Sequence, residues 1–307
     1  MFPTLNHFLQ YAFGFELPFN LPSYGIIFAF SLFLSAFVLY LELKRKNREG
    51  TIKMPVVEKK RNGEIATSVV KPVNLVADFL FLAVIWGIIG SKVFHILENA
   101  SEFAKDPAGM IFSFQGFSFY GGLIAAAIAI TMYSRKRKMA LRHLLDVFSP
   151  TLILAYGVGR MACQVSGDGD WGIVNTLAKP GWIPQWLWAY NYPHNVINAG
   201  VPIPGCAGEY CHVLPEGVFP TPVYETLMCV TFFIILMSLR KRLKPPGMLF
   251  GIYLLMNGTE RFLIEKIRVN NKYDLGFMNV TQAEIVSTII FLCGVLFLFW
   301  LRKIKKT

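Results

Sequence analysis

Seven stretches of this chain are long and apolar enough to cross a lipid bilayer as α-helices, and no other feature limits the possible folds as strongly. A spanning helix needs about 20 predominantly apolar residues. No internal repeat is evident. The sequence therefore predicts an all-α integral membrane protein, a bundle of about seven transmembrane helices in a single membrane domain, residues 1–307. The predicted spans are residues 24–43, 73–96, 114–134, 144–165, 222–239, 248–267 and 283–301.

Composition supports this class of protein and argues against a soluble nucleic-acid-binding domain. Of the 307 residues, 54% are hydrophobic and 16% are charged. A soluble domain does not have enough polar surface to cover so many apolar residues. The net charge of +11 would suit nucleic acid only if the basic residues formed one face of a folded soluble domain. They lie instead in loops between apolar stretches, so nucleic acid is not an expected partner.

The basic residues predict the orientation of the bundle, because loops rich in Lys and Arg are retained on the cytoplasmic side. All four basic clusters lie inside if the N-terminus is outside and the C-terminus is inside. The last outer loop keeps Arg268 and Lys272 as a minor exception. The clusters are residues 44–61, 135–142, 240–244 and 302–306, with eight, five, four and four basic residues.

The loops follow from this orientation. Residues 44–72 become a basic cytoplasmic loop, expected to be mobile in solvent or to lie against anionic lipid. No basic segment precedes the first span, which runs into Lys44 as a stop-transfer signal would, so a retained span is favoured over a cleaved signal peptide.

Residues 166–220 form the long outer-face segment, with Trp and Tyr residues clustered in it. Such rings favour the headgroup level, so the segment is expected to be either a cap with a short interfacial helix or an ordinary ordered loop. A disulfide between Cys206 and Cys211 is the preferred interpretation of its cysteines. A metal pair with His212 has too few ligands, and the spacing does not fit haem attachment.

Ionisable residues inside the spans are the candidates for function, because burying them in lipid is costly. Arg160, Glu225, Arg261 and Tyr120 are all predicted to lie within two turns of the outer surface. Two arginines at one depth indicate an anionic ligand, and a phospholipid phosphate suits guanidinium geometry. The ionisable residues in the spans are Asp78, Lys92, Arg160, Glu225, Glu260, Arg261 and Glu265.

The sixth span carries Asn257, Arg261 and Glu265 at i, i+4 and i+8, a stripe that should face the interior of the bundle, with Glu260 beside it. An interhelical ion pair of Arg261 with Glu225 or Glu265 that only holds the bundle together is the structural alternative.

A glycine-rich stretch, GRMACQVSGDGDWG at residues 159–172, follows the fourth span. Its glycines permit close approach of the backbone to a ligand. Asp168 and Asp170 in this turn are site candidates, although turn formation or weak metal binding would also account for them.

Four motifs, in order along the third to sixth spans, resemble the prolipoprotein diacylglyceryl transferase family. They are SFYGGLIA at 118–125, GRMACQVSGDGDWG at 159–172, FPTPVYE at 219–225 and NGTERFLIE at 257–265. The resemblance covers most of the chain, from Tyr24 onward. It implies a phosphatidylglycerol–prolipoprotein diacylglyceryl transferase of the bacterial inner (cytoplasmic) membrane. Such an enzyme moves the diacylglyceryl group of phosphatidylglycerol to the lipobox cysteine of a preprolipoprotein, releases glycerol phosphate and uses no cofactor or metal.

The resemblance also implies site residues. Arg160 and Arg261 match the family's arginines and would hold the phosphate as charge develops on it. Asp168 falls near the acidic residue of the family signature, with Asp170 as the alternative match. Tyr24 and Glu225 match shared positions. Together with Asp170 and with Asn257 and Glu265 of the stripe on the sixth span, they are expected to contact substrate.

Two departures from the family pattern concern the chemistry. Many members have His where this chain has Tyr120, and a phenol with an ordinary pKa near ~10 is a poor base at neutral pH. Tyr120 could instead donate a hydrogen bond. Cys163 stands where many members have Asn. An anionic-lipid transporter or a relative with changed activity are the alternatives, although transport sites usually lie near the bilayer midplane.

Overall fold

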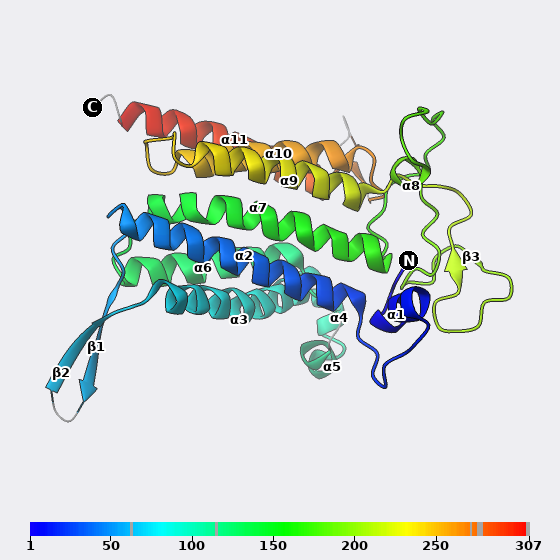
Figure 1. Ribbon diagram of the computed structural model, residues 1–307, viewed down its shortest axis with the longest axis horizontal. Helices are drawn as coiled ribbons and strands as arrows, with labels where there is room; N and C mark the ends of the chain where they lie inside the picture. The colour runs from blue at the N-terminus through cyan, green and yellow to red at the C-terminus, as the bar shows by residue number, and fades with distance from the viewer. Residues whose placement is uncertain (62–63, 114–115, 271, 275–278, 305–307) are drawn as a thin grey trace. The chain divides into compact units, whose positions relative to one another are not determined.

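The protein is described from a computed structural model, which covers residues 1–61, 64–113, 116–270, 272–274 and 279–304. Seven helices within these ranges have 18 residues or more, and each coincides with a predicted span (Figure 1). They are α2 (Ser23–Arg48), α3 (Pro72–Glu98), α6 (Phe119–Lys136), α7 (Leu141–Ser166), α9 (Thr221–Leu239), α10 (Met248–Glu265) and α11 (Gln282–Ile304).

Four of these helices, α2, α3, α9 and α11, have the length and apolar composition needed to cross a membrane. The protein is therefore a mostly helical membrane protein, as predicted. The helices α7 and α10, which supply Arg160, Arg261 and Glu265 of the site described below, do not meet this criterion within the described residues. A bundle with seven crossings and a defined orientation stays a prediction.

Two predicted boundaries change. The third span was expected to begin at residue 114, but 114–115 lie outside the described residues and α6 begins at Phe119, directly after Ser118. The segment 44–72, predicted to be a cytoplasmic loop, also contains regular secondary structure. The helix α2 continues to Arg48, and β1 (Val56–Arg61) pairs antiparallel with β2 (Glu64–Val69), from Val56 opposite Val69 onward.

The remaining elements are short. The helix α1 (Leu5–Phe13), which lies outside the predicted spans, begins after the N-cap residue Thr4 and is followed by the C-cap residue Gly14 with φ +73°. The others are α4 (Ala100–Phe103), α5 (Pro107–Phe112), α8 (Gln185–Trp188), the strand pair β3 (Val201–Pro202) with β4 (His212–Val213), and the strand pair β5 (Lys272–Asp274) with β6 (Asn279–Thr281).

The chain divides into two compact units, residues 1–35 with 148–307 and residues 36–147, so the division passes through α2 and α7. In the second unit, α3 lies against α6 (Figure 1). A Cβ on Gly90 would lie 2.4 Å from the Cβ of Ala125 and 2.5 Å from the carbonyl oxygen of Gly121. The glycines of the SFYGGLIA motif therefore allow two helix backbones to approach closely.

In the first unit, α10 packs against α11 and α9 (Figure 1). The Thr226 hydroxyl of α9 donates a hydrogen bond to the Gly157 carbonyl of α7 at 2.9 Å. Ser31 of α2 donates to the Ala155 carbonyl of α7 at 2.7 Å. The buried core between these helices contains Ile153, Cys229, Leu236 and Leu249.

Residues 166–220, all of them described, contain one short helix, α8, of four residues and the β3–β4 pair. A position of this segment at the membrane surface stays a prediction. Tyr192 is fully buried, its hydroxyl donates to Gln164 at 2.7 Å, and its ring packs on Trp171. The predicted disulfide between Cys206 and Cys211 is present, with a Cα–Cα distance of 5.7 Å.

Candidate active site

The glycine-rich turn after α7 brings its aspartates to the end of α10. Gly167 and Gly169 have φ values of +69° and +97°, a backbone conformation that residues with a Cβ atom rarely adopt. The Gly172 amide then donates to the Phe219 carbonyl at 2.9 Å, and the Ile173 amide donates to the Ile267 carbonyl at 2.8 Å. These bonds fix the turn between the start of α9 and the end of α10.

Glu225, at the start of α9, is the centre of a cluster of ion pairs. Its side chain is 1% exposed and contacts three guanidinium groups. The contact with Arg160 is direct, and the N–O distances to Arg261 and Arg268 are 3.3 and 3.6 Å. A carboxylate buried this deeply needs such partners, because an isolated charge would lose its hydration without compensation.

Asp170 bridges two of the same arginines. One carboxylate oxygen, Oδ2, accepts from Arg160, and the other, Oδ1, accepts from Arg268. The Asp170 carbonyl accepts a hydrogen bond from the Thr221 hydroxyl at 2.8 Å, which holds the residue against the start of α9. Among the described ion pairs, Asp170 is thus the one loop carboxylate that pairs both with Arg160 of α7 and with Arg268, in the segment after α10.

Arg261 completes the cluster from α10. It pairs with Glu265 one turn later at 3.3 Å, in addition to Glu225. Glu265 also accepts a hydrogen bond from Asn270 at 2.6 Å. The ion pairs of Arg261 with Glu225 and with Glu265, which the sequence also allowed as contacts that only stabilise the bundle, therefore both form.

Two further buried groups lie next to the cluster. The Arg160 guanidinium lies over the Tyr156 ring, 5.0 Å from its centre. Glu260, adjacent to Arg261 in sequence, is fully buried, and neither carboxylate oxygen has a hydrogen-bond partner within the described part of the chain.

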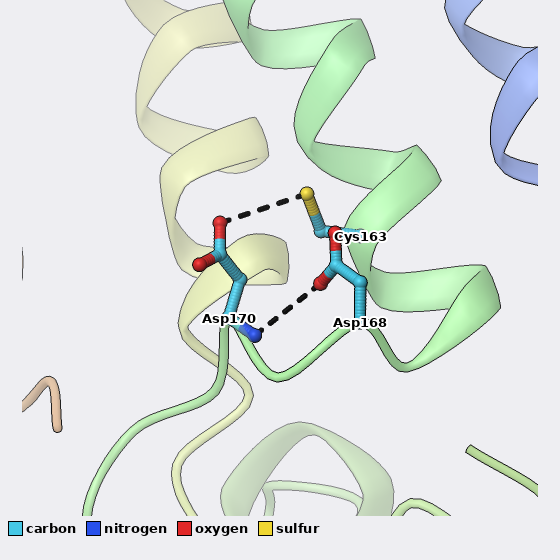
Figure 2. A group of neighbouring side chains, drawn as sticks. All are labelled: Cys163, Asp168 and Asp170. Carbon is cyan, nitrogen blue, oxygen red and sulfur yellow. Dashed lines mark hydrogen bonds between the residues drawn. The ribbon is translucent and has the colours of Figure 1, made fainter. Parts of the chain in front are cut away.

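Asp168, Asp170 and Cys163 form a smaller group at the edge of the cluster (Figure 2). Asp168 accepts from the Asp170 amide at 3.3 Å, and the Cys163 thiol lies 3.7 Å from Asp170 Oδ2. Burial raises the pKa of the Asp168 carboxyl above its usual range, although a hydrogen bond from Cys163 and the charge of Arg160 oppose the shift.

Within the described residues, these same three have ligand atoms close enough together for a metal ion, within 4.8 Å of one another. Both oxygens of Asp170 already pair with guanidinium groups. A cation there would lie beside Arg160 and be repelled by it. The chemistry of this donor set therefore fits an ion-pair network better than a metal centre.

The structure brings together most of the residues predicted from sequence. Arg160, Asp170, Glu225, Arg261 and Glu265 form the cluster, and Asp168 borders it.

The other predicted residues take no part in the described ion pairs of the cluster. Tyr24 stacks on Phe28 at the start of α2, near enough to Asp168 and Arg160 to interact electrostatically. Asn257 lies two turns before Glu265 on α10 and is half-buried. Tyr120 belongs to the other compact unit, where its ring contacts Phe119.

Two ionisable residues from the predicted list belong to the second unit and have local roles. The Tyr133 hydroxyl donates to Asp78. Lys92 donates to the Ser113 carbonyl at 2.8 Å.

Arg268 is the site residue that sequence reasoning missed, since it was treated as an exception in an outer loop. Its side chain is 9% exposed and pairs with Asp170 and Glu225. The available signal was its spacing, because Arg268 follows Arg261 by seven residues, two helical turns, and extends the polar stripe of the sixth span.

Comparison with known proteins decides the family. The family model for prolipoprotein diacylglyceryl transferase matches residues 10–300, nearly the whole chain and every residue of the cluster. This chain belongs to the prolipoprotein diacylglyceryl transferase family.

Relatives that carry the name phosphatidylglycerol–prolipoprotein diacylglyceryl transferase come from several bacteria. The protein from Dehalococcoides mccartyi is 29% identical over 229 residues, 74% of this chain and 77% of the relative. The proteins from Corynebacterium glutamicum and Xylella fastidiosa are 28% and 27% identical, over 76% and 73% of this chain and 72% and 76% of the relatives. Membership of this family explains the four sequence motifs, which all lie within the matched residues.

Proposed function

We propose that this chain transfers the diacylglyceryl group of phosphatidylglycerol to the thiol of a lipobox cysteine in a preprolipoprotein. The thiolate sulfur attacks the glyceryl carbon that carries the phosphate ester. A C–S thioether bond forms, the C–O bond breaks, and glycerol phosphate leaves with the electron pair and an added negative charge. The thiol proton passes to a base or to water.

The observation that carries this proposal is the convergence of three guanidinium groups, from Arg160, Arg261 and Arg268, at one end of the helices in a chain of this family. Phosphate departure concentrates negative charge, and preorganised guanidinium groups stabilise charge that develops in the transition state. A thiol has an ordinary pKa of ~8.5, so nearby positive charge favours the reactive thiolate.

Other residues of the proposed site have supporting roles. Asp168, Glu225 and Glu265 would orient the arginines, and Tyr24 and Asn257 would contact the lipid. Tyr120 would donate a hydrogen bond to substrate, and no general base is assigned. No cofactor enters the proposed reaction.

The proposed setting is the bacterial inner membrane, crossed by seven helices with the N-terminus outside and the C-terminus inside. The basic clusters support this orientation. The Cys206–Cys211 disulfide supports an outer-face position for residues 166–220, because disulfides persist in oxidising compartments.

The proposed reaction is tested with purified protein in detergent, labelled phosphatidylglycerol and a lipobox peptide, with a Cys-to-Ser peptide as control. Transfer that depends on the peptide thiol is expected. Arg160→Ala and Arg261→Ala should each lower the rate by about 10²–10³-fold or more, because each removes charge stabilisation from the transition state.

Arg242→Ala is the matched control, since this exposed arginine lies in the loop between α9 and α10, at the opposite end of both helices from the cluster. It should leave transfer unchanged. Full activity in both site variants would remove the assignment of those arginines. Absence of transfer by well-folded protein, with several phospholipids offered, would favour a relative with changed activity or a lipid transporter.

A further inference from the structure

The charges of the cluster are already matched one for one. Three guanidinium groups, Arg160, Arg261 and Arg268, pair with three carboxylates, Asp170, Glu225 and Glu265. With all six ionised, this set carries no net charge. A phosphate that enters it gains strong attraction only if one carboxylate gives up its arginines.

Burial indicates which carboxylate can leave. The side chains of Glu225 and Glu265 are 1% and 0% exposed and lie on helices, whereas the Asp170 side chain is 32% exposed and lies in a loop. Moving a buried carboxylate away from its arginines would leave an uncompensated buried charge, which is strongly destabilising. Asp170 can exchange its arginines for water at far lower cost, and Gly169 beside it, with φ +97°, permits a change of backbone conformation.

The geometry of Asp170 matches that of the expected ligand. Its two oxygens contact two different guanidinium groups, Oδ2 on Arg160 and Oδ1 on Arg268. Two non-bridging oxygens of a phosphodiester would make the same pair of charge-assisted contacts.

We propose that the Asp170 carboxylate holds the place of the lipid phosphate between Arg160 and Arg268, and that phosphatidylglycerol displaces it on binding. Arg268 is then a further phosphate-binding residue, and Asp170 is a competing internal anion rather than a substrate ligand. This inference rests on the proposed function. It explains how buried arginines stay paired while the site is empty of lipid.

The first test compares the affinity of purified variants for glycerol phosphate, the proposed product. Asp170→Asn keeps the shape of the side chain but removes its charge, and it should bind glycerol phosphate about tenfold more tightly, a gain of about 1.4 kcal/mol. Arg268→Gln should bind it more weakly. Unchanged or weaker binding by Asp170→Asn would overturn the displacement, and so would failure of every variant to bind.

Asp106→Asn is the matched control, because it makes the same chemical change at an exposed N-cap of α5, where the carboxylate accepts from the Gly109 amide and takes no part in the cluster. Its affinity for glycerol phosphate should stay close to that of the unchanged protein. Equal gains in both variants would mean that only long-range charge is involved, and the displacement would be rejected.

The second test needs no variant and therefore does not depend on how Asp170→Asn folds. Hydrogen exchange of the amides at 168–171 is measured in the full-length protein with and without glycerol phosphate. Exchange should become faster with glycerol phosphate, because the Asp170 amide loses its bond to Asp168 when the turn moves. Slower exchange would show that the turn tightens on the ligand and would overturn the proposal.

The transfer assay separates this proposal from the proposed function. Transfer by the unchanged protein, without a gain in affinity in Asp170→Asn, would reject the displacement alone. Tighter binding in Asp170→Asn, in a protein that transfers no lipid, would reject the function and retain the displacement.

Discussion

The two aspartates of the glycine-rich turn, two residues apart, have different environments. Asp170 is paired with two arginines, whereas Asp168 accepts hydrogen bonds from the Asp170 amide and from Cys163. Burial raises the pKa of Asp168, because its charged form loses hydration. The folded state therefore binds the Asp168 proton more tightly than the unfolded chain does. The resulting stabilisation is present below the unfolded pKa of ~3.9 and is lost as pH rises through the raised folded pKa.

Asp168→Asn removes this ionisation and keeps an oxygen that can accept from the Asp170 amide. We expect the variant to have a higher Tm than the unchanged protein at pH 8, with the difference shrinking toward pH 4. Thermal unfolding in detergent at several pH values measures it. A lower Tm at pH 8 would mean that the Asp168 charge stabilises the turn, contrary to this interpretation.

At the scale of elements, glycines set how closely helices approach. Gly90 of α3 faces the backbone of α6, whereas a Cβ on Gly87, one turn earlier on the same helix, would meet no atom within 4 Å. The existence of these helices was predictable from apolar length alone. The start of α6 and the β1–β2 hairpin were not, because a hairpin carries a weaker local signal than a span.

Gly90→Ala should destabilise the protein by about 1–3 kcal/mol, because its Cβ would overlap the Gly121 carbonyl and force α3 and α6 apart. Gly87→Ala is the matched control and should be neutral or slightly stabilising, since alanine is the better helix former. Thermal unfolding of both variants in detergent measures the difference. Equal Tm values would show that α3 and α6 do not pack through Gly90.

At the scale of the whole molecule, the distribution of Lys and Arg predicts which ends of the helices face the cytoplasm. The disulfide in 166–220 agrees with an oxidising environment for the opposite side. The basic residues of 240–244 and the disulfide both belong to the compact unit that holds the cluster, so the predicted orientation would put the arginine cluster at the outer face.

Orientation is measured with single added cysteines in a Cys293→Ser background, in which Cys163 and Cys229 are buried. A membrane-impermeant maleimide applied to intact cells should label Lys179→Cys, in the 166–220 segment, and not Lys241→Cys, between α9 and α10. Labelling of Lys241→Cys alone would reverse the orientation, and labelling of both would contradict a fixed single orientation.

The helices and five residues of the cluster could be predicted from the sequence, because apolar length and helical spacing are local properties of the chain. The sequence also predicts that Arg160, Glu225 and Arg261 lie near the same end of their helices. Which charges form ion pairs depends on the tertiary fold. Arg268 contacts Asp170 across 98 residues of sequence, through a turn fixed by hydrogen bonds to Phe219 and Ile267. The pairing of distant charges depends on how the loops fold back over the helix ends, which no local pattern encodes.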